Sequence, residues 1–407
     1  MTTVLDDSLR GALRKADPVR LLGDLVRAPS HPGVERQEER VAQLLAEYLR
    51  PCGLDVELQE VRPGRPNLLA RLAGRGGGRS LLLCGHTDTV PPNALMSIEP
   101  FAAQIRDGRL QGRGACDMKG ALAAMAVALA VLARSGPKLA GDLTLAAVID
   151  EETQSLGAEA VVQSGLRAEG CVVGEPTENR VAIGHRGLEL LQVEFTGRAA
   201  HGGAPDEGLN AIAAAARFVQ LIEDELAPAL ARRTHALLGA STVNVGVIHG
   251  GDQPNTVAAR CIVQLERRWI VGETVERMNA EMEALLERVR DERAGVSTRL
   301  RRVPGSMATL AHGPLETPPE HPLVGCSLAA RAEVCGRSEA PGAFAAWTDA
   351  ALLWREAGIP CVVMGPGSLA QAHTADEWIS IEQVREAACQ YVALALRFCG
   401  APDPGSV

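Results

Sequence analysis

The stretch LLLCGHTDTVPP at residues 81–92 decides the fold of this chain. Its apolar beginning predicts a buried strand, which ends in His86 and Asp88 just before two helix-breaking prolines. Ligands of an α/β sheet bind outside the carboxyl ends of its strands, and strand residues two positions apart point the same way. We therefore expect His86 and Asp88 to converge on one spot, as a metal ligand and the carboxylate that orients it.

Two more apolar strands end in acidic residues. Residues 143–149 are followed by Asp-Glu-Glu at 150–152, and residues 171–174 are followed directly by Glu175. Adjacent carboxylates repel each other unless a cation is present, although a solvated loop is the alternative interpretation. A mainly parallel sheet covered by helices places all these strand ends on one edge. The sequence therefore predicts an α/β domain that gathers carboxylates at one edge of its sheet.

The remaining donors come from two loops. Asp117 lies in the glycine-rich segment GRGACDMKG at 112–120, and His373 follows a short apolar strand at 361–364. The segment lacks the phosphate-loop pattern, and a lone Asp at a helix start is usually a cap. The prediction that Asp117 is a metal ligand therefore depends on the presence of the other donors. Two histidines and several carboxylates without cysteine suit Zn²⁺, with Co²⁺ or Mn²⁺ as alternatives.

The donor count fits two metal ions rather than one. Two metals about 3.5–4 Å apart require a bridging carboxylate and terminal ligands on each side. We assign the roles as follows: Asp117 as the bridge, His86 and Glu175 on one metal, Glu152 and His373 on the other.

Two carboxylates remain outside this ligand set. Asp88 is expected to accept the second imidazole N–H of His86 and so to fix its tautomer. Glu151 is expected to act as the general base that takes the proton of a metal-bound water. A nucleophilic hydroxide and a polarised carbonyl together predict the hydrolysis of an amide.

Composition excludes several other classes of protein. The net charge of 41 − 50 = −9 argues against a nucleic-acid partner. The longest apolar run, at 120–133, is too short to span a bilayer and predicts a buried helix, and residues 1–20 do not have the pattern of a signal peptide. The ten cysteines form no CxxC pairs, which suits a reducing compartment. We expect a cytoplasmic protein that binds neither nucleic acid nor membrane.

The pattern changes in the second half of the chain. Alternating strands and amphipathic helices between 184 and 303 predict a compact α+β insertion, because strand, helix, two strands, helix and strand follow in order. At 407 residues the chain is long enough for more than one core. The predicted domains are a catalytic domain in two parts, 1–183 and 304–407, and the insertion at 184–303.

Seven segments together resemble the M20 metallohydrolases, a family that includes acetylornithine deacetylases, succinyl-diaminopimelate desuccinylases, aminoacylases and glutamate carboxypeptidases. They are GHTDTVP (85–91), GRGACDMKG (112–120), DEE (150–152), GEPT (174–177), RAAHGGAPDEGLNAI (198–212), GGDQPN (250–255) and GPGSLAQAHTADE (365–377). They run through nearly the whole chain in family order. The last segment is most similar to the acetylornithine deacetylase branch.

The resemblance implies a fold and an assembly. The catalytic domain would be a phosphorylase/hydrolase-like zinc-peptidase domain with a mixed, mostly parallel sheet, and the insertion a ferredoxin-like dimerisation domain. It also implies two divalent metal ions held as assigned above, a cis peptide bond between Asp117 and Met118, and a homodimer formed through residues 184–303.

The resemblance also implies roles outside the metal ligands. His201 matches the family's oxyanion-stabilising histidine, which reaches the partner's active site, whereas its glycine-rich surroundings alone predict an exposed turn residue. Four positions match the family's contacts to the substrate carboxylate: Asn255, Arg268, Gly365 and Gly367. Arg268 has the planar fork that suits a carboxylate, but an ordinary surface ion pair is an equal alternative.

We therefore predict a dinuclear amidohydrolase that removes a short acyl group from an N-acyl amino acid. A succinyl-diaminopimelate desuccinylase is the nearest alternative, followed by a carboxypeptidase or dipeptidase of the same fold. A non-catalytic binding protein is the alternative from another class. It would predict erosion of the ligand set or loss of Glu151, and the sequence shows neither.

Overall fold

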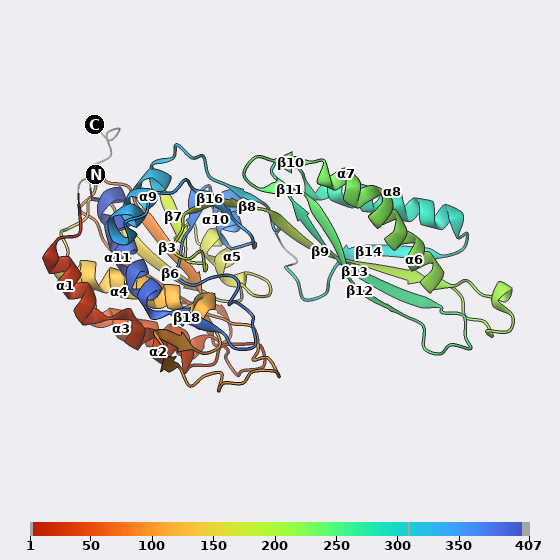
Figure 1. Ribbon diagram of the computed structural model, residues 1–407, viewed down its shortest axis with the longest axis horizontal. Helices are drawn as coiled ribbons and strands as arrows, with labels where there is room; N and C mark the ends of the chain where they lie inside the picture. The colour runs from red at the N-terminus through yellow and green to blue at the C-terminus, as the bar shows by residue number, and fades with distance from the viewer. Residues whose placement is uncertain (1–2, 308–309, 401–407) are drawn as a thin grey trace. The chain divides into compact units, whose positions relative to one another are not determined.

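The computed structural model describes residues 3–307 and 310–400, which form two compact units (Figure 1). The main unit contains residues up to Gly184 together with Leu315–Phe344 and the chain from Thr348 onward. The insertion contains His185–Pro314 and Ala345–Trp347. It returns to the main unit later than the position 304 expected from the sequence, because Leu188 at its start pairs with His312.

A nine-stranded sheet forms the centre of the main unit. The strand order is β1-β2-β6-β3-β7-β17-β8-β15, with β16 paired to β8. Their bounds are β1 Asp55–Arg62, β2 Arg65–Leu72, β3 Leu81–His86, β6 Leu143–Val148, β7 Gly170–Val173, β8 Ala182–His185, β15 Leu315–Glu316, β16 Gly342–Phe344 and β17 Cys361–Val363.

The predicted mixed sheet is confirmed, and its parallel strands β6, β3, β7 and β17 lie at its centre. Strand β3 runs parallel to β6 and β7, and β7 runs parallel to β17. The pairs β1–β2, β2–β6 and β17–β8 are antiparallel. Strands β1 and β2 run antiparallel because they form a tight hairpin, and a short connection can only join antiparallel strands.

Helices cover both faces of this sheet (Figure 1). Helix α4 packs against β3 and β6 and against α1, α2 and α11, whereas α10 packs against β7, β17 and α5. The helix bounds are α1 Asp7–Ala16, α2 Pro18–Val26, α3 Glu39–Leu49, α4 Gly120–Ser135, α5 Leu156–Gln163, α9 Pro322–Cys335, α10 Ala350–Ala357 and α11 Ile381–Phe398.

Helix α4 is the core helix that the apolar run predicted. All its residues from Gly120 to Leu132 are buried. The segment Ala115–Ser135 has the length and composition to cross a membrane, but 94% of its most apolar window is buried inside the fold. A helix that is apolar on all sides is expected at the centre of a large unit.

A small sheet lies beside the start of α4. Strands β4 (Gln104–Arg106) and β5 (Arg109–Gln111) form a hairpin around Asp107 and Gly108. Strand β18 (Trp378–Ser380) pairs with β5. This pairing brings the segment that follows His373 next to the segment that carries Asp117.

The insertion has the predicted ferredoxin-like fold. Strands β9 (Gly187–Thr196), β12 (Thr242–Gly250), β13 (Arg260–Trp269) and β14 (Ser297–Arg302) form an antiparallel sheet in the order β12-β13-β9-β14. Its helices are α6 (Ala211–Leu221), α7 (Ala227–Ala231) and α8 (Val275–Glu292), and the short strands β10 (Thr234–His235) and β11 (Gly239–Ala240) pair as a hairpin. Alternate residues of β9, among them Val193 and Phe195, are buried in the core of the insertion.

The replacement Leu129→Ala tests the role of α4 as the core of the main unit. Leu129 is fully buried, so the cavity should lower the free energy of unfolding by about 2–5 kcal/mol. Urea denaturation followed by circular dichroism measures the loss. The control is Leu95→Ala, at a leucine that is 81% exposed and where a change within about 0.5 kcal/mol is expected. Equal effects of the two replacements would contradict this packing.

Candidate metal centre and active site

The parallel strands bring the predicted donors to one edge of the main sheet. His86 ends β3 and pairs in register with Val148 at the end of β6. The turn after β6 carries Glu151 and Glu152, and Glu175 follows β7. Neighbouring parallel strands end at the same edge, so donors far apart in the sequence become neighbours.

The carboxylate of Asp117 lies between the two histidines. Its Oδ1 is 3.1 Å from Nε2 of His86, and its Oδ2 is 3.2 Å from Nε2 of His373. Oε1 of Glu152 lies 3.0 Å from Nε2 of His373, and Oε1 of Glu175 lies 3.9 Å from Nε2 of His86. The two histidines thus face different oxygens of Asp117, with Glu175 near His86 and Glu152 near His373.

The electrostatics of these groups fit a cation. Burial and the charge of Asp117 raise the pKa of Glu152 and hold the pKa of Glu175 far above its usual value. Oε1 of Glu175 is buried without a hydrogen-bond partner among the described residues. Donor atoms of His86, Asp117 and Glu152 all lie within 4.8 Å of one another. Hard oxygen and imidazole donors at this density suit a divalent ion of the zinc, cobalt or manganese type.

The imidazoles compensate part of this charge. Hydrogen bonds to Asp117 and Glu152 raise the pKa of His373 to about 10. Burial disfavours the charged form of His86, but hydrogen bonds to Asp117 and Asp88 together with the charges of Asp88 and Glu175 outweigh burial, and its pKa is raised. The two histidines in turn hold the pKa of Asp117 below its usual range despite its burial. The positive charge that the raised pKa values favour on both histidines thus offsets part of the negative charge of the carboxylates.

Asp88 has two kinds of contact. Nδ1 of His86 lies 3.0 Å from the backbone oxygen of Asp88 and 3.5 Å from its carboxylate, so the backbone oxygen is the closer acceptor. The carboxylate accepts hydrogen bonds of 3.1 Å from the backbone N–H groups of both Glu151 and Glu152. Asp88 thus holds the segment that carries the predicted base and a predicted ligand, a contact that the sequence had not suggested.

Glu151 lies among like charges. Burial raises its pKa well above the usual value, and the negative charges of Glu175, Asp349 and Glu152 act in the same direction against that of His86. A carboxylate whose pKa is raised binds a proton more strongly, as a general base requires.

Asp349 is a buried residue near this centre that the sequence analysis missed. It begins α10 without capping it, and burial raises its pKa to about 7 although the Ser155 hydroxyl opposes the shift. Its sequence context, a polar residue before an apolar helix, is that of an ordinary cap. Two features distinguish Asp349 from an ordinary cap: its side chain makes no capping hydrogen bond to α10, and its charge raises the pKa of Glu151.

Two further buried residues, Arg113 and Glu377, were also missed. Their side chains form an ion pair of 2.7 Å in which each is about 1% exposed. The peptide bond between Asp117 and Met118, next to this pair, is cis as the resemblance implied.

The predicted residues of the insertion form contacts within it. His201 is exposed, and its Nδ1 accepts a hydrogen bond of 3.0 Å from the backbone of Gly203. The backbone oxygen of Asn255 accepts one of 2.7 Å from Gly202. Arg268 forms a forked ion pair with Glu266, at 2.7 and 3.2 Å. That pair is the alternative that the sequence left open for Arg268, and substrate contacts at these positions stay predictions.

The predicted glycine loop is tied into the main unit. The N–H of Gly365 donates to the hydroxyl of Thr177 at 3.1 Å, and the N–H of Gly367 donates to the side chain of Gln383 at 2.8 Å. A side chain at Gly365 would collide with the backbone oxygen of Gly174, and Gly367 has a φ of +90°. The local structure therefore explains why glycine occupies both positions, whether or not either residue contacts a substrate.

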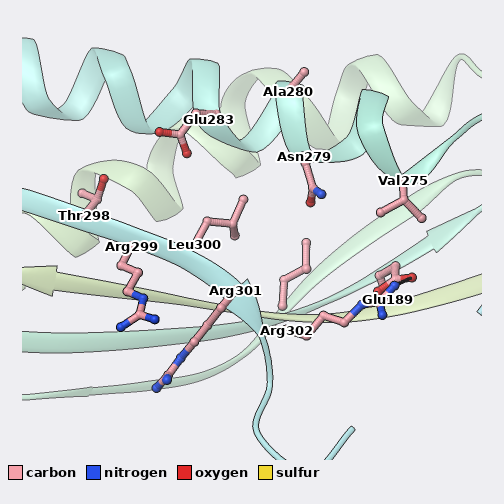
Figure 2. Close-up of a pocket in the computed structure, with 11 residues that line it drawn as sticks. Glu189, Val275, Asn279, Ala280, Glu283, Thr298, Arg299, Leu300, Arg301 and Arg302 are labelled. Carbon is pink, nitrogen blue, oxygen red and sulfur yellow. Dashed lines mark hydrogen bonds and ion pairs between the residues drawn. The ribbon is translucent and has the colours of Figure 1, made fainter. Parts of the chain in front are cut away.

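A pocket of about 590 Å³ in the insertion is not this centre (Figure 2). It lies between α8 and the edge strand β14, and Leu300 and Thr298 point towards α8 whereas Arg299 and Arg301 point away. Arg302 is neutralised by a forked ion pair with Glu189, at 2.8 and 2.9 Å. None of the predicted site residues lines this pocket.

The fold and the centre together define a class, the metal-dependent hydrolases of peptide-like bonds, and comparison with known proteins gives the family. Residues 82–397 match the family model of peptidase family M20/M25/M40. The chain therefore belongs to this family, and it is an M20 hydrolase.

A relative with a similar sequence agrees with this placement, and two solved structures share the fold. An acetylornithine deacetylase from Photorhabdus laumondii is 32% identical over 388 residues, which cover 89% of this chain and 92% of the relative. The aminopeptidase PepT from Bacillus cereus has a TM-score of 0.77 at 22% identity, with 94% and 98% of the two chains covered. YXEP from Bacillus subtilis, described as a dinuclear metal-binding peptidase, has a TM-score of 0.69 at 16% identity, with 94% and 98% covered.

The stability of the metal-free protein should depend on the protonation of His373. Its pKa rises from 6.5 to about 10 on folding, so its contribution is fully present below pH 6.5 and is lost as the pH rises through about 10. We expect the melting temperature of the chelated protein to fall across this window, and added Zn²⁺ to remove most of the fall.

The variant His373→Asn is the control for this prediction. It cannot take up the proton, so its melting temperature should change less between pH 6.5 and 10. Equal pH dependence in the two proteins, measured by differential scanning fluorimetry, would contradict the role of His373.

Proposed function

We propose that this M20 hydrolase is a dinuclear metal-dependent deacylase that removes a short acyl group from an N-acyl amino acid, in the manner of an acetylornithine deacetylase. The observation that carries the proposal is the Asp117 carboxylate, which offers one oxygen to the half-site of His86 and Glu175 and the other to the half-site of His373 and Glu152. A dinuclear centre needs such a bridge. The relative described as an acetylornithine deacetylase supports the substrate class.

The chain's own residues supply the remaining chemistry. Bound zinc, cobalt or manganese would lower the pKa of water and polarise the amide carbonyl. Glu151 takes the proton of the attacking water and delivers it to the leaving amine nitrogen. Asp88 holds the backbone of Glu151 in place. We assign to His201 the N–H that stabilises the charge developing on the carbonyl oxygen, as the family resemblance implies.

A substrate panel tests the proposed activity. The metal-loaded protein is given N-acetylornithine, N-succinyl-diaminopimelate, other N-acyl amino acids and dipeptides, and release of the free amine is measured. The proposal predicts the highest kcat/KM for a short N-acyl amino acid. Preference for the succinylated substrate or for dipeptides would favour the desuccinylase or the dipeptidase alternative, and no turnover at all would favour a binding protein.

The variant Glu151→Gln tests the general base. The amide keeps the size of the side chain but cannot take up a proton, so kcat should fall by about 10²–10⁴-fold. Metal content, measured by atomic emission, should stay unchanged because Glu151 is not a ligand. Full turnover by the variant would contradict the role of Glu151 as general base. Loss of metal from the variant would indicate that Glu151 is a metal ligand instead.

We further propose that the protein is a homodimer formed through the insertion. The sheet of the insertion has two edges, β12 and β14. Strand β14 carries several arginines, which discourage pairing with another strand, whereas β12 (TVNVGVIHG) has no Lys, Arg, Asp or Glu. Ile248 on β12 is 48% exposed and Ile212 at the start of α6 is 40% exposed. An uncharged edge with exposed apolar side chains favours β12 as the dimer edge.

The variant Ile248→Lys tests this assembly. A charge on the β12 edge should convert the dimer to a monomer in light scattering, because edge lysines oppose strand pairing. The matched control is Ile105→Lys, at a 61% exposed isoleucine on the edge strand β4 of the main unit. A wild type that is already monomeric, or a dimer that survives at Ile248→Lys, would contradict the proposed interface.

We also propose a cytoplasmic location and a role in amino-acid biosynthesis. All ten cysteines are free, and several of them are buried in the sheet. Free buried cysteines suit a reducing compartment. The biosynthetic role depends on the proposed substrate, so the substrate panel tests it as well.

A further inference from the structure

The side chain of Glu377 holds the backbone of the segment that carries Asp117. It is about 1% exposed. One carboxylate oxygen accepts hydrogen bonds from Nη1 of Arg113 at 2.7 Å and from the N–H of Gly114 at 2.9 Å. The other accepts from the N–H groups of Cys116 at 2.8 Å and Asp117 at 3.0 Å. Four donors from one short segment thus converge on a single buried carboxylate.

Arg113 extends this contact to the segment that carries His373. Its Nη2 donates at 3.1 Å to the backbone oxygen of Thr374, the residue after His373. The backbone oxygen of Glu377 accepts a hydrogen bond of 3.0 Å from Gly112. The segments 112–117 and 373–377 are therefore joined through buried, charge-assisted hydrogen bonds, although the two side chains are 264 positions apart.

We propose that Arg113 and Glu377 are positioning residues that fix Asp117 relative to His373 and thereby set the metal affinity of the centre. Neither side chain belongs to the assigned ligand set. The inference rests on the proposed dinuclear centre. A buried ion pair often adds little net stability compared with apolar residues of the same volume, so a geometric role accounts better for this pair. Residues that hold ligands in this way typically change metal affinity by about 10–100-fold when they are replaced.

The two residues should have different effects. Glu377 binds the segment of Asp117, which both metal positions share, so its loss should weaken both positions. The fork of Arg113 also reaches the backbone oxygen of Thr374, the residue next to His373, so its loss should weaken mainly the position formed by His373 and Glu152. A general loss of stability would weaken both metal positions in either variant. A selective effect of Arg113 on one position therefore distinguishes the positioning role from a loss of stability.

Two conservative variants separate these effects. In Glu377→Gln the amide keeps the size, but its NH₂ group faces two of the four donors, which lose their acceptor. In Arg113→Lys the positive charge beside Glu377 remains, but a single ammonium group cannot reproduce the fork to Thr374. The matched control is Asp376→Asn, because the carboxylate of this adjacent residue binds Ser97 instead, at 2.8 and 2.6 Å.

The test is a Co²⁺ titration of the metal-free full-length chain, followed by calorimetry and by the visible absorption of bound cobalt. Wild type and Asp376→Asn should bind two equivalents with the same affinities and spectra. In Glu377→Gln both affinities should fall by about tenfold or more, with altered cobalt absorption. In Arg113→Lys one affinity should fall by about tenfold and the other should stay unchanged.

Wild-type cobalt binding by Glu377→Gln, or equal weakening of both positions in Arg113→Lys, would overturn the inference. A wild type that binds no cobalt would overturn the metal-centre proposal itself, and the positioning role with it. Circular dichroism of the metal-free variants checks folding. If Glu377→Gln does not fold, the asymmetry in Arg113→Lys decides the question.

Discussion

The structure depends on one carboxylate placed between two imidazoles. Asp117 faces His86 with one oxygen and His373 with the other, at 3.1 and 3.2 Å. Around it lie Glu151, Glu152 and Glu175, whose pKa values burial and mutual repulsion raise. Folding brings these like charges together, and without a cation only protons and the histidines offset the repulsion. A centre built in this way favours the binding of a cation, whatever the substrate is.

The fold explains how such a centre is assembled from distant segments. Parallel strands at the centre of the sheet end at one edge and deliver His86, the acidic turn after β6, and Glu175. The small sheet of β4, β5 and β18 places the segment after His373 beside that of Asp117. The insertion folds around its own core and contributes residues for which the family resemblance, rather than local geometry, suggests a role.

Much of the centre could be predicted from the sequence because its donors follow apolar strands, and a topological rule places strand ends together. Arg113, Asp349 and Glu377 escaped prediction because their partners are distant: Arg113 and Glu377 are 264 positions apart. Asp349 looked like a helix cap, and only the packed structure shows that it caps nothing. The sheet was predicted to be mostly parallel, but the short connection between β1 and β2 forces these two strands to run antiparallel.

Anomalous diffraction from crystals grown with Zn²⁺ tests the central claim most directly. We expect two zinc peaks about 3.5–4 Å apart, bridged by Asp117, with His86 and Glu175 on one ion and Glu152 and His373 on the other. A single peak, peaks without Asp117 between them, or zinc bound elsewhere in the chain would contradict the claim.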